Sequence, residues 1–85
     1  MSRGLNKMIA KKSLQLSKCK KGDRLQIVFI PDGLQRSQLI RFGIIEGDIV
    51  HCLENLPGGT TVIQKNRQEI AIGYKFANKI IVTKI

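Results

Sequence analysis

The sequence has few of the residue types on which membrane spans, disulfide scaffolds and catalytic centres depend. Its 85 residues include no tryptophan, one histidine, two cysteines and two prolines. No apolar run approaches the roughly 18 residues that a membrane-spanning helix needs. The opening MSRGLNKMIA is basic, but no apolar segment follows it, so no secretory signal is predicted. We therefore expect a cytoplasmic protein whose two cysteines stay reduced.

The scarcity of histidine and carboxylates also argues against an active site. The six acidic residues are scattered along the sequence. The sequence shows no catalytic arrangement of a nucleophile with a general base. Neither an enzyme nor a cofactor is therefore predicted. His51 and Cys52 are the weak candidates for metal ligands. They are neighbours on a predicted strand, so their side chains should point to opposite faces. No paired cysteine or histidine spacing typical of metal sites occurs, which favours an exposed histidine beside a buried cysteine.

Negative charge is scarce and positive charge is unevenly distributed. Fifteen basic and six acidic residues give a net charge of +9. Residues 1–21 hold seven basic and no acidic residues, so the other 64 residues carry only +2. Residues 1–13 are predicted to form a flexible basic arm. Such a segment can bind an anionic membrane surface or nucleic acid, or can simply be solvated. The lysines expected to act electrostatically are Lys7, Lys11, Lys12, Lys18, Lys20 and Lys21.

The sequence does contain a series of short strand-like segments. In RLQIVFI (24–30), Leu25, Ile27 and Phe29 are expected on one face, with apolar residues also on the other, so this strand should be covered on both sides. A packing segment at 13–23, strands at 48–54, 61–65, 68–72 and 80–85, and a helical turn at 73–79 complete the pattern. About five strands with one helix after the first long strand predict a mainly β fold, a small barrel whose closure removes exposed edges.

The segment LQRSQLIRF (34–42) predicts the single helix, with Leu39 and Phe42 facing the core. Gly43 stands where a helix stop needs a left-handed residue. Gly47 suits the third position of a type II turn just before the next strand. These two glycines are predicted to be structural turn residues that redirect the chain from helix to strand.

The order and spacing of these elements resemble the ferrous-iron transport protein A (FeoA) family over residues 14–85. The resemblance is carried by LIRFGIIEGDIV (39–50), PGG (57–59), IAI (70–72) and ANKIIV (77–82). The sequence departs from the family pattern at Cys19, Phe42, Glu46 and Gly73. The resemblance implies an SH3-like barrel over residues 14–85. It further implies a cytoplasmic accessory protein of bacterial ferrous-iron uptake that acts on the membrane transporter FeoB.

The alternative is a nucleic-acid-binding or metal-dependent transcription-regulator module. The same barrel resembles the C-terminal domain of iron-dependent repressors of the diphtheria-toxin-repressor type, although this chain lacks their helical DNA-binding part. Only four aromatic residues are present, and with Phe29 and Phe42 expected in the core, few remain for stacking on bases.

An interaction module is expected to act through exposed loops held on a rigid scaffold. The candidate partner-binding residues are therefore those of the loop at 56–59 and of the turn at 74–76. They are Leu56, Pro57, Gly58, Gly59, Tyr74 and Phe76.

Overall fold

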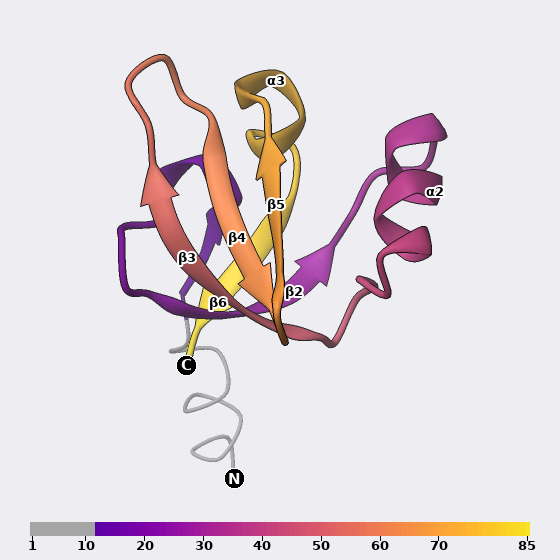
Figure 1. Cartoon of the computed structure of the whole chain (residues 1–85), viewed down its shortest axis with the longest axis horizontal. Coiled ribbons are helices and arrows are strands. Elements are labelled where there is room, and N and C mark those ends of the chain that lie inside the picture. Colours follow the sequence, from indigo (N-terminus) through magenta and orange to yellow (C-terminus); the bar gives the residue numbers. More distant parts are fainter. Residues whose placement is uncertain (1–11) are drawn as a thin grey trace, which may run out of the picture.

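Short strands with alternating apolar residues build one antiparallel sheet that curls around a single core (Figure 1). The computed structural model describes residues 12–85. Its strands are β1 (Ser13–Gln15), β2 (Arg24–Phe29), β3 (Ile49–Asn55), β4 (Thr61–Lys65), β5 (Gln68–Ile72) and β6 (Ile81–Lys84). Its helices are the 3-10 helix η1 (Leu16–Lys18), α2 (Leu34–Arg41) and α3 (Tyr74–Ala77). The sheet order is β1-β6-β2-β3-β4-β5, which confirms the predicted mainly β fold.

The core forms on the concave side of the sheet because alternate strand residues share one face. Leu25 and Ile27 of β2, Val50 of β3, Ile63 of β4 and Val82 of β6 are all buried. Buried residues of η1, α3 and the segment after α2 close the ends of this core. β1 is the strand that the sequence did not predict: its three residues pair with β6, in a segment expected only to pack.

The two-sided burial predicted for β2 is wrong. The pairing of β2 with β6 shifts register between Ile27 and Phe29, as at a β-bulge. Such an irregularity breaks the inward–outward alternation. Consequently Val28 and Phe29 are both about half exposed, at 47% and 50%, and the next residue, Ile30, is buried again. Phe29 is therefore not a core residue.

The joint between α2 and β3 forms as predicted. Gly43 has φ +80° and Gly47 has φ +94°. The N–H of Ile44 donates to the carbonyl of Leu39 at 2.9 Å and so ends α2, while a hydrogen bond of 3.1 Å from Asp48 N to Ile45 O closes the turn.

The core position predicted for Phe42 is wrong. Leu39 is buried, but the Phe42 side chain is 50% exposed. Phe42 is the residue that caps the C-terminus of α2, and α2 stands away from the sheet (Figure 1). Leu39 is the single residue of α2 that is buried, so the helix contacts the core through a narrow stripe.

None of the helices within residues 12–85 is long and apolar enough to cross a bilayer.

Candidate partner-docking groove

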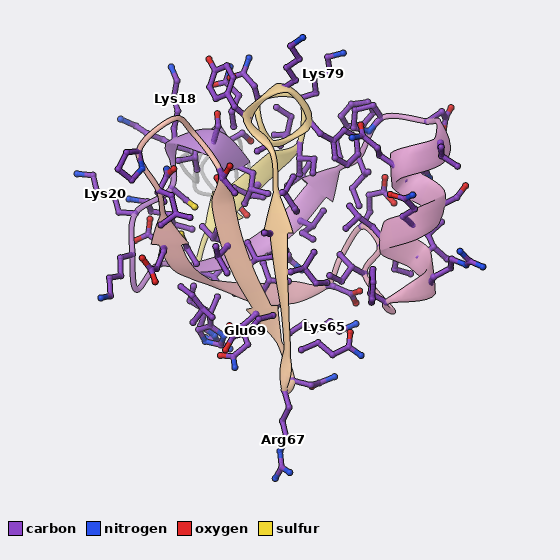
Figure 2. All side chains as sticks on the ribbon, turned by 45° about the horizontal axis from the view of Figure 1, so that its top comes forward. Lys18, Lys20, Lys65, Arg67, Glu69 and Lys79 are labelled. Carbon is purple, nitrogen blue, oxygen red and sulfur yellow. The ribbon has the colours of Figure 1, made fainter. Side chains whose placement is uncertain are left out.

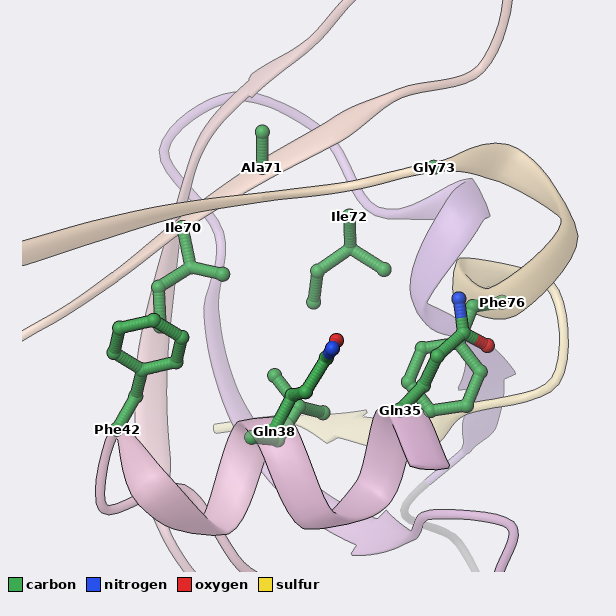
Figure 3. A pocket seen from close by; sticks show the side chains of 9 residues that line it. Gln35, Gln38, Phe42, Ile70, Ala71, Ile72, Gly73 and Phe76 are labelled. Carbon is green, nitrogen blue, oxygen red and sulfur yellow. The ribbon is translucent and has the colours of Figure 1, made fainter. Parts of the chain in front are cut away.

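A groove of about 170 Å³ separates α2 from β5 (Figure 3). β5 is the last strand of the sheet, and α2 forms the opposite wall. Ile70 and Ile72 point from β5 into the groove, whereas Ala71 points away from it. Phe42 lies beside Ile70 at one end, and Phe76 of α3 lies at the other. The groove is thus apolar at both ends, and the amides of Gln35 and Gln38 supply its polar lining.

An ion pair between Arg36 and Glu46 positions α2. Arg36 Nη2 donates to Glu46 Oε1 at 2.9 Å, and Arg36 Nη1 donates to the carbonyl of Ile30 at 2.9 Å. The N–H of Ile30 in turn donates to Glu46 Oε2 at 3.1 Å. The hydrogen bonds from Arg36 are the main reason that the pKa of Glu46 falls from 4.5 to about 2. This network joins the helix to the end of β2 and to the turn before β3.

A second contact fixes the C-terminus of α2. Lys65 of β4 donates through its ammonium group to the carbonyl of Gly43 and to Asp48 Oδ2, the latter at 2.9 Å. Asp48 Oδ2 also accepts a hydrogen bond of 2.8 Å from the N–H of Ile45. The Lys65 hydrogen bond is the largest cause of the lowered pKa of Asp48. The helix stop and the following turn are therefore held to β4.

The structure divides the six predicted partner-binding residues between two places. The β3–β4 loop lies against α3: a Cβ placed on Gly59 would be 2.6 Å from Tyr74 Cδ1, so the Tyr74 ring rests directly on this glycine. Leu56, Pro57, Gly58, Gly59 and Tyr74 thus gather at one end of the barrel. Phe76 is buried and lines the groove instead. Their role in binding a partner stays a prediction.

The lysines predicted to act electrostatically do not all belong to an arm. Lys7 and Lys11 lie outside the described residues, and Lys12 directly precedes β1. Lys18 lies in η1, and Lys20 and Lys21 lie in the connection to β2, so these three are part of the folded domain. All three are exposed, and Figure 2 shows Lys18 and Lys20 pointing away from the barrel.

His51 is exposed and Cys52 is buried, as expected for neighbours on one strand. Cys19 is the residue that approaches Cys52, and both are reduced in the core. Burial, followed by a hydrogen bond that the Cys19 thiol makes to Cys52, raises the pKa of the Cys19 thiol. Within residues 12–85, no three His, Cys, Asp or Glu side chains gather as a metal site would require.

The groove residues on α2 were not identified from the sequence, although a signal was present. Gln35, Gln38, Leu39 and Phe42 have the i, i+3, i+4, i+7 spacing of one helix face. Only Leu39 of this face reaches the core. The sheet order that places β5 opposite the rest of the face cannot be read from helix periodicity.

The fold and the groove together define a small SH3-like barrel with an open cleft lined by apolar and amide side chains. The chain belongs to the FeoA family, because the model of the FeoA domain matches residues 14–84. The family suggested by the sequence is thereby confirmed, and membership supports a role in ferrous-iron uptake. No protein with a curated description matches the chain in sequence.

Several solved structures share the fold, among them a FeoA protein, a FeoA-like protein and ScaR. The crystal structure of an iron uptake regulatory protein (FeoA) is 29% identical, with a TM-score of 0.76 over 87% of this chain and 100% of that one. A FeoA-like protein from Clostridium acetobutylicum is 17% identical, with a TM-score of 0.71 over 87% of this chain and 88% of that one. ScaR with bound Zn²⁺ is 23% identical, with a TM-score of 0.73 over 89% of this chain. The match spans only 38% of ScaR.

Proposed function

We propose that this chain is a cytoplasmic, non-catalytic accessory protein that binds the membrane ferrous-iron transporter FeoB and modulates it. The observation that carries the proposal is an open groove, lined by both apolar and amide side chains, on a member of the FeoA family. Binding sites are typically concave and combine apolar side chains with a few polar groups. Phe42 is the main anchor in this assignment, because its aromatic ring is half exposed on the groove wall.

The basic N-terminal segment adds a second contribution. An anionic cytoplasmic leaflet attracts nearby basic residues by about 1 kcal/mol each. This attraction raises the local concentration of the domain beside a membrane partner without orienting it. In the proposal, the groove supplies the orientation and specificity, with the Leu56–Gly59 loop and Tyr74 as additional contacts.

The test compares binding of the full chain to transporter-containing vesicles and to transporter-free vesicles of the same lipid. Phe42→Ala is expected to weaken transporter-dependent binding by about tenfold, the loss of one aromatic anchor. Phe29→Ala is the matched control, because Phe29 is equally exposed, at 50%, but does not line the groove. Equal binding to both vesicle types, or equal effects of the two substitutions, would contradict the proposal.

Nucleic-acid binding is the second candidate, and a specific observation favours it. Phe29, Phe42 and Tyr74 are each about half exposed, so three aromatic rings are available for stacking in a chain of net charge +9. The three rings lie on different elements, namely β2, the end of α2 and α3. They do not form one continuous surface on which successive bases could stack. Tight, salt-dependent binding to a single-stranded oligonucleotide, with no preference for transporter-containing vesicles, would favour this alternative.

A further inference from the structure

The outer edge of β5 is an unpaired strand edge that runs along the groove. Lys65 pairs with Gln68 across the two-residue turn Asn66–Arg67, in which Asn66 has φ +57°. In a hairpin of this type, the residues next to the turn form a hydrogen-bonded pair, and hydrogen-bonded and non-hydrogen-bonded pairs then alternate along the ladder. The backbone N–H and C=O groups of Gln68, Ile70 and Ile72 therefore bond to β4. Those of Glu69 and Ala71 point outward.

These outward groups have no backbone partner within residues 12–85. An edge of this length without proline is a template for pairing with another extended chain. The opposite edge of the sheet, β1, is only three residues long. Ile70 and Ile72 point from β5 into the groove toward α2, so a strand paired to the β5 edge would extend the sheet face that lines the groove. The edge is thus open to an extended segment.

The size of the groove also favours a strand over a helix. An α-helix with side chains is about 10–12 Å wide and has already used its own backbone groups, so it would leave the β5 edge unpaired. A cavity of roughly 150 Å³ accepts a benzene-sized group, so the groove of about 170 Å³ can take one or two aliphatic side chains. Ile70 and Ile72 share one face of β5, and a paired strand would present alternate residues to them.

The charges around the groove indicate which end of the incoming segment should carry an acidic residue. Arg41 lines a hollow with Gln38 and Phe42, at the Phe42 end of the groove. Arg67 extends from the tip of the β4–β5 hairpin at the same end (Figure 2). Neither arginine has a salt-bridge partner within the part of the chain that the structure describes, and no carboxylate lines the groove. An acidic residue in the segment is complementary to this end.

We propose that the groove binds an extended segment of a partner protein by β-strand addition to the outer edge of β5. The segment carries apolar residues at alternate positions and an acidic residue at the Phe42 end. This inference rests on the proposed function only in taking the groove as the partner site. It adds the chemistry of the ligand: backbone hydrogen bonds give affinity, and alternate side chains give specificity.

The test uses the full chain and three N-acetylated synthetic peptides. The first alternates threonine and valine over six residues and ends in Asp-Glu, and a second has the acidic pair at the other end. The third replaces the acidic pair by two lysines. One of the two acidic peptides is expected to bind at least tenfold more tightly than the lysine peptide. Methylation of every second backbone nitrogen of the better peptide is expected to abolish its binding. If neither acidic peptide binds more tightly than the lysine peptide, or methylation has no effect, the proposal is overturned.

The matched variants are Ala71→Pro and Ala71→Val. Proline removes the outward N–H at an edge position where it does not break the β4 ladder, and valine keeps that N–H while adding similar bulk. The Ala71 side chain points away from the groove, so both changes act there mainly through the backbone. Peptide binding is expected to weaken at least tenfold in Ala71→Pro and to be retained in Ala71→Val. Equal binding by both overturns strand addition. If Ala71→Pro does not fold, the methylated peptides decide the question.

The same variants separate this inference from the proposed function. Transporter binding that is lost with Phe42→Ala but retained with Ala71→Pro would overturn strand addition and leave the proposed function standing. Peptide binding with no transporter binding would support strand addition and overturn the proposed function. A concentration-dependent dimer that disappears in Ala71→Pro would show that a second copy of this chain occupies the edge, and would overturn the assignment to another protein.

Discussion

Arg36 and Glu46 form a bidentate ion pair that links α2 to the turn before β3. The guanidinium of Arg36 contacts both oxygens of Glu46, and the carboxylate also accepts the N–H of Ile30. Because Leu39 is the one buried residue of α2, this pair carries much of the orientation of the groove wall.

The first prediction concerns acid sensitivity. The pKa of Glu46 lies at about 2 in the folded protein, chiefly through the hydrogen bonds from Arg36, against an ordinary value of 4.5. A lowered folded pKa contributes stability that is present above the ordinary pKa and is lost as the pH falls from there toward the folded value. The urea midpoint should therefore fall less between about pH 6 and about pH 3 in Glu46→Gln than in the wild-type protein. Parallel midpoint curves for the two proteins would contradict this role.

The second prediction concerns the contact between Gly59 and Tyr74. Gly58 and Gly59 have similar positive φ values, +93° and +96°, but only a Cβ on Gly59 meets another residue. Gly58→Ala should cost about 1–3 kcal/mol of unfolding free energy, from backbone strain alone. Gly59→Ala should cost more, because the Tyr74 ring must also move. Chemical denaturation measures both, and Tyr74→Ala should recover part of the loss in Gly59→Ala. Equal costs at the two glycines would show that the ring moves freely.

The third prediction tests the stop of α2. Gly43 has φ +80°, and a Cβ there would lie 3.8 Å from Lys65 Nζ, an ordinary contact. Gly43→Val should therefore destabilise through backbone strain rather than collision, by about 1–3 kcal/mol. The free energy of unfolding in urea is the measurement. An unchanged value would mean that the chain can end α2 without a left-handed residue.

The fourth prediction concerns the boundary between the basic segment and the barrel. β1 begins at Ser13. Deleting residues 1–12 should leave the melting temperature nearly unchanged and weaken binding to anionic vesicles. The weakening should become smaller at high salt, because the Debye length falls to roughly 3 Å at 1 M. A truncated protein that does not fold would show that the domain begins before Ser13.

The fifth prediction uses the buried thiols. Burial raises the pKa of Cys19, whereas the unfolded thiol ionises near about pH 8.5. A raised folded pKa gives stability that is fully present below the unfolded value and is lost as the pH rises above it. The urea midpoint should fall between about pH 7 and about pH 9.5, and it should fall less in Cys19→Ala. Equal slopes would mean that Cys19 ionises as readily in the fold as in the unfolded chain.

Local sequence determined the hairpin and the turns. The strands at 61–65 and 68–72 and the turn at Asn66–Arg67 lie where the pattern predicts. Gly43 and Gly47 adopt the left-handed conformations that their positions indicate. These features depend on neighbours only a few residues away, so their chemistry can be read directly from the chain. The family signature depends on the same local features, which explains why it could be identified from sequence.

Only the tertiary structure decided which aromatic residues are exposed and where the groove lies. Phe29 is exposed because a register shift against β6, more than fifty residues away, breaks the alternation of β2. Phe42 is exposed because α2 stands off the sheet, held by Arg36 and Glu46 rather than by a broad apolar face. The groove itself forms between α2 and the last strand of a sheet whose order is not the order of the sequence. Contacts between different elements of the fold set all three features, and no periodicity within a single element encodes them.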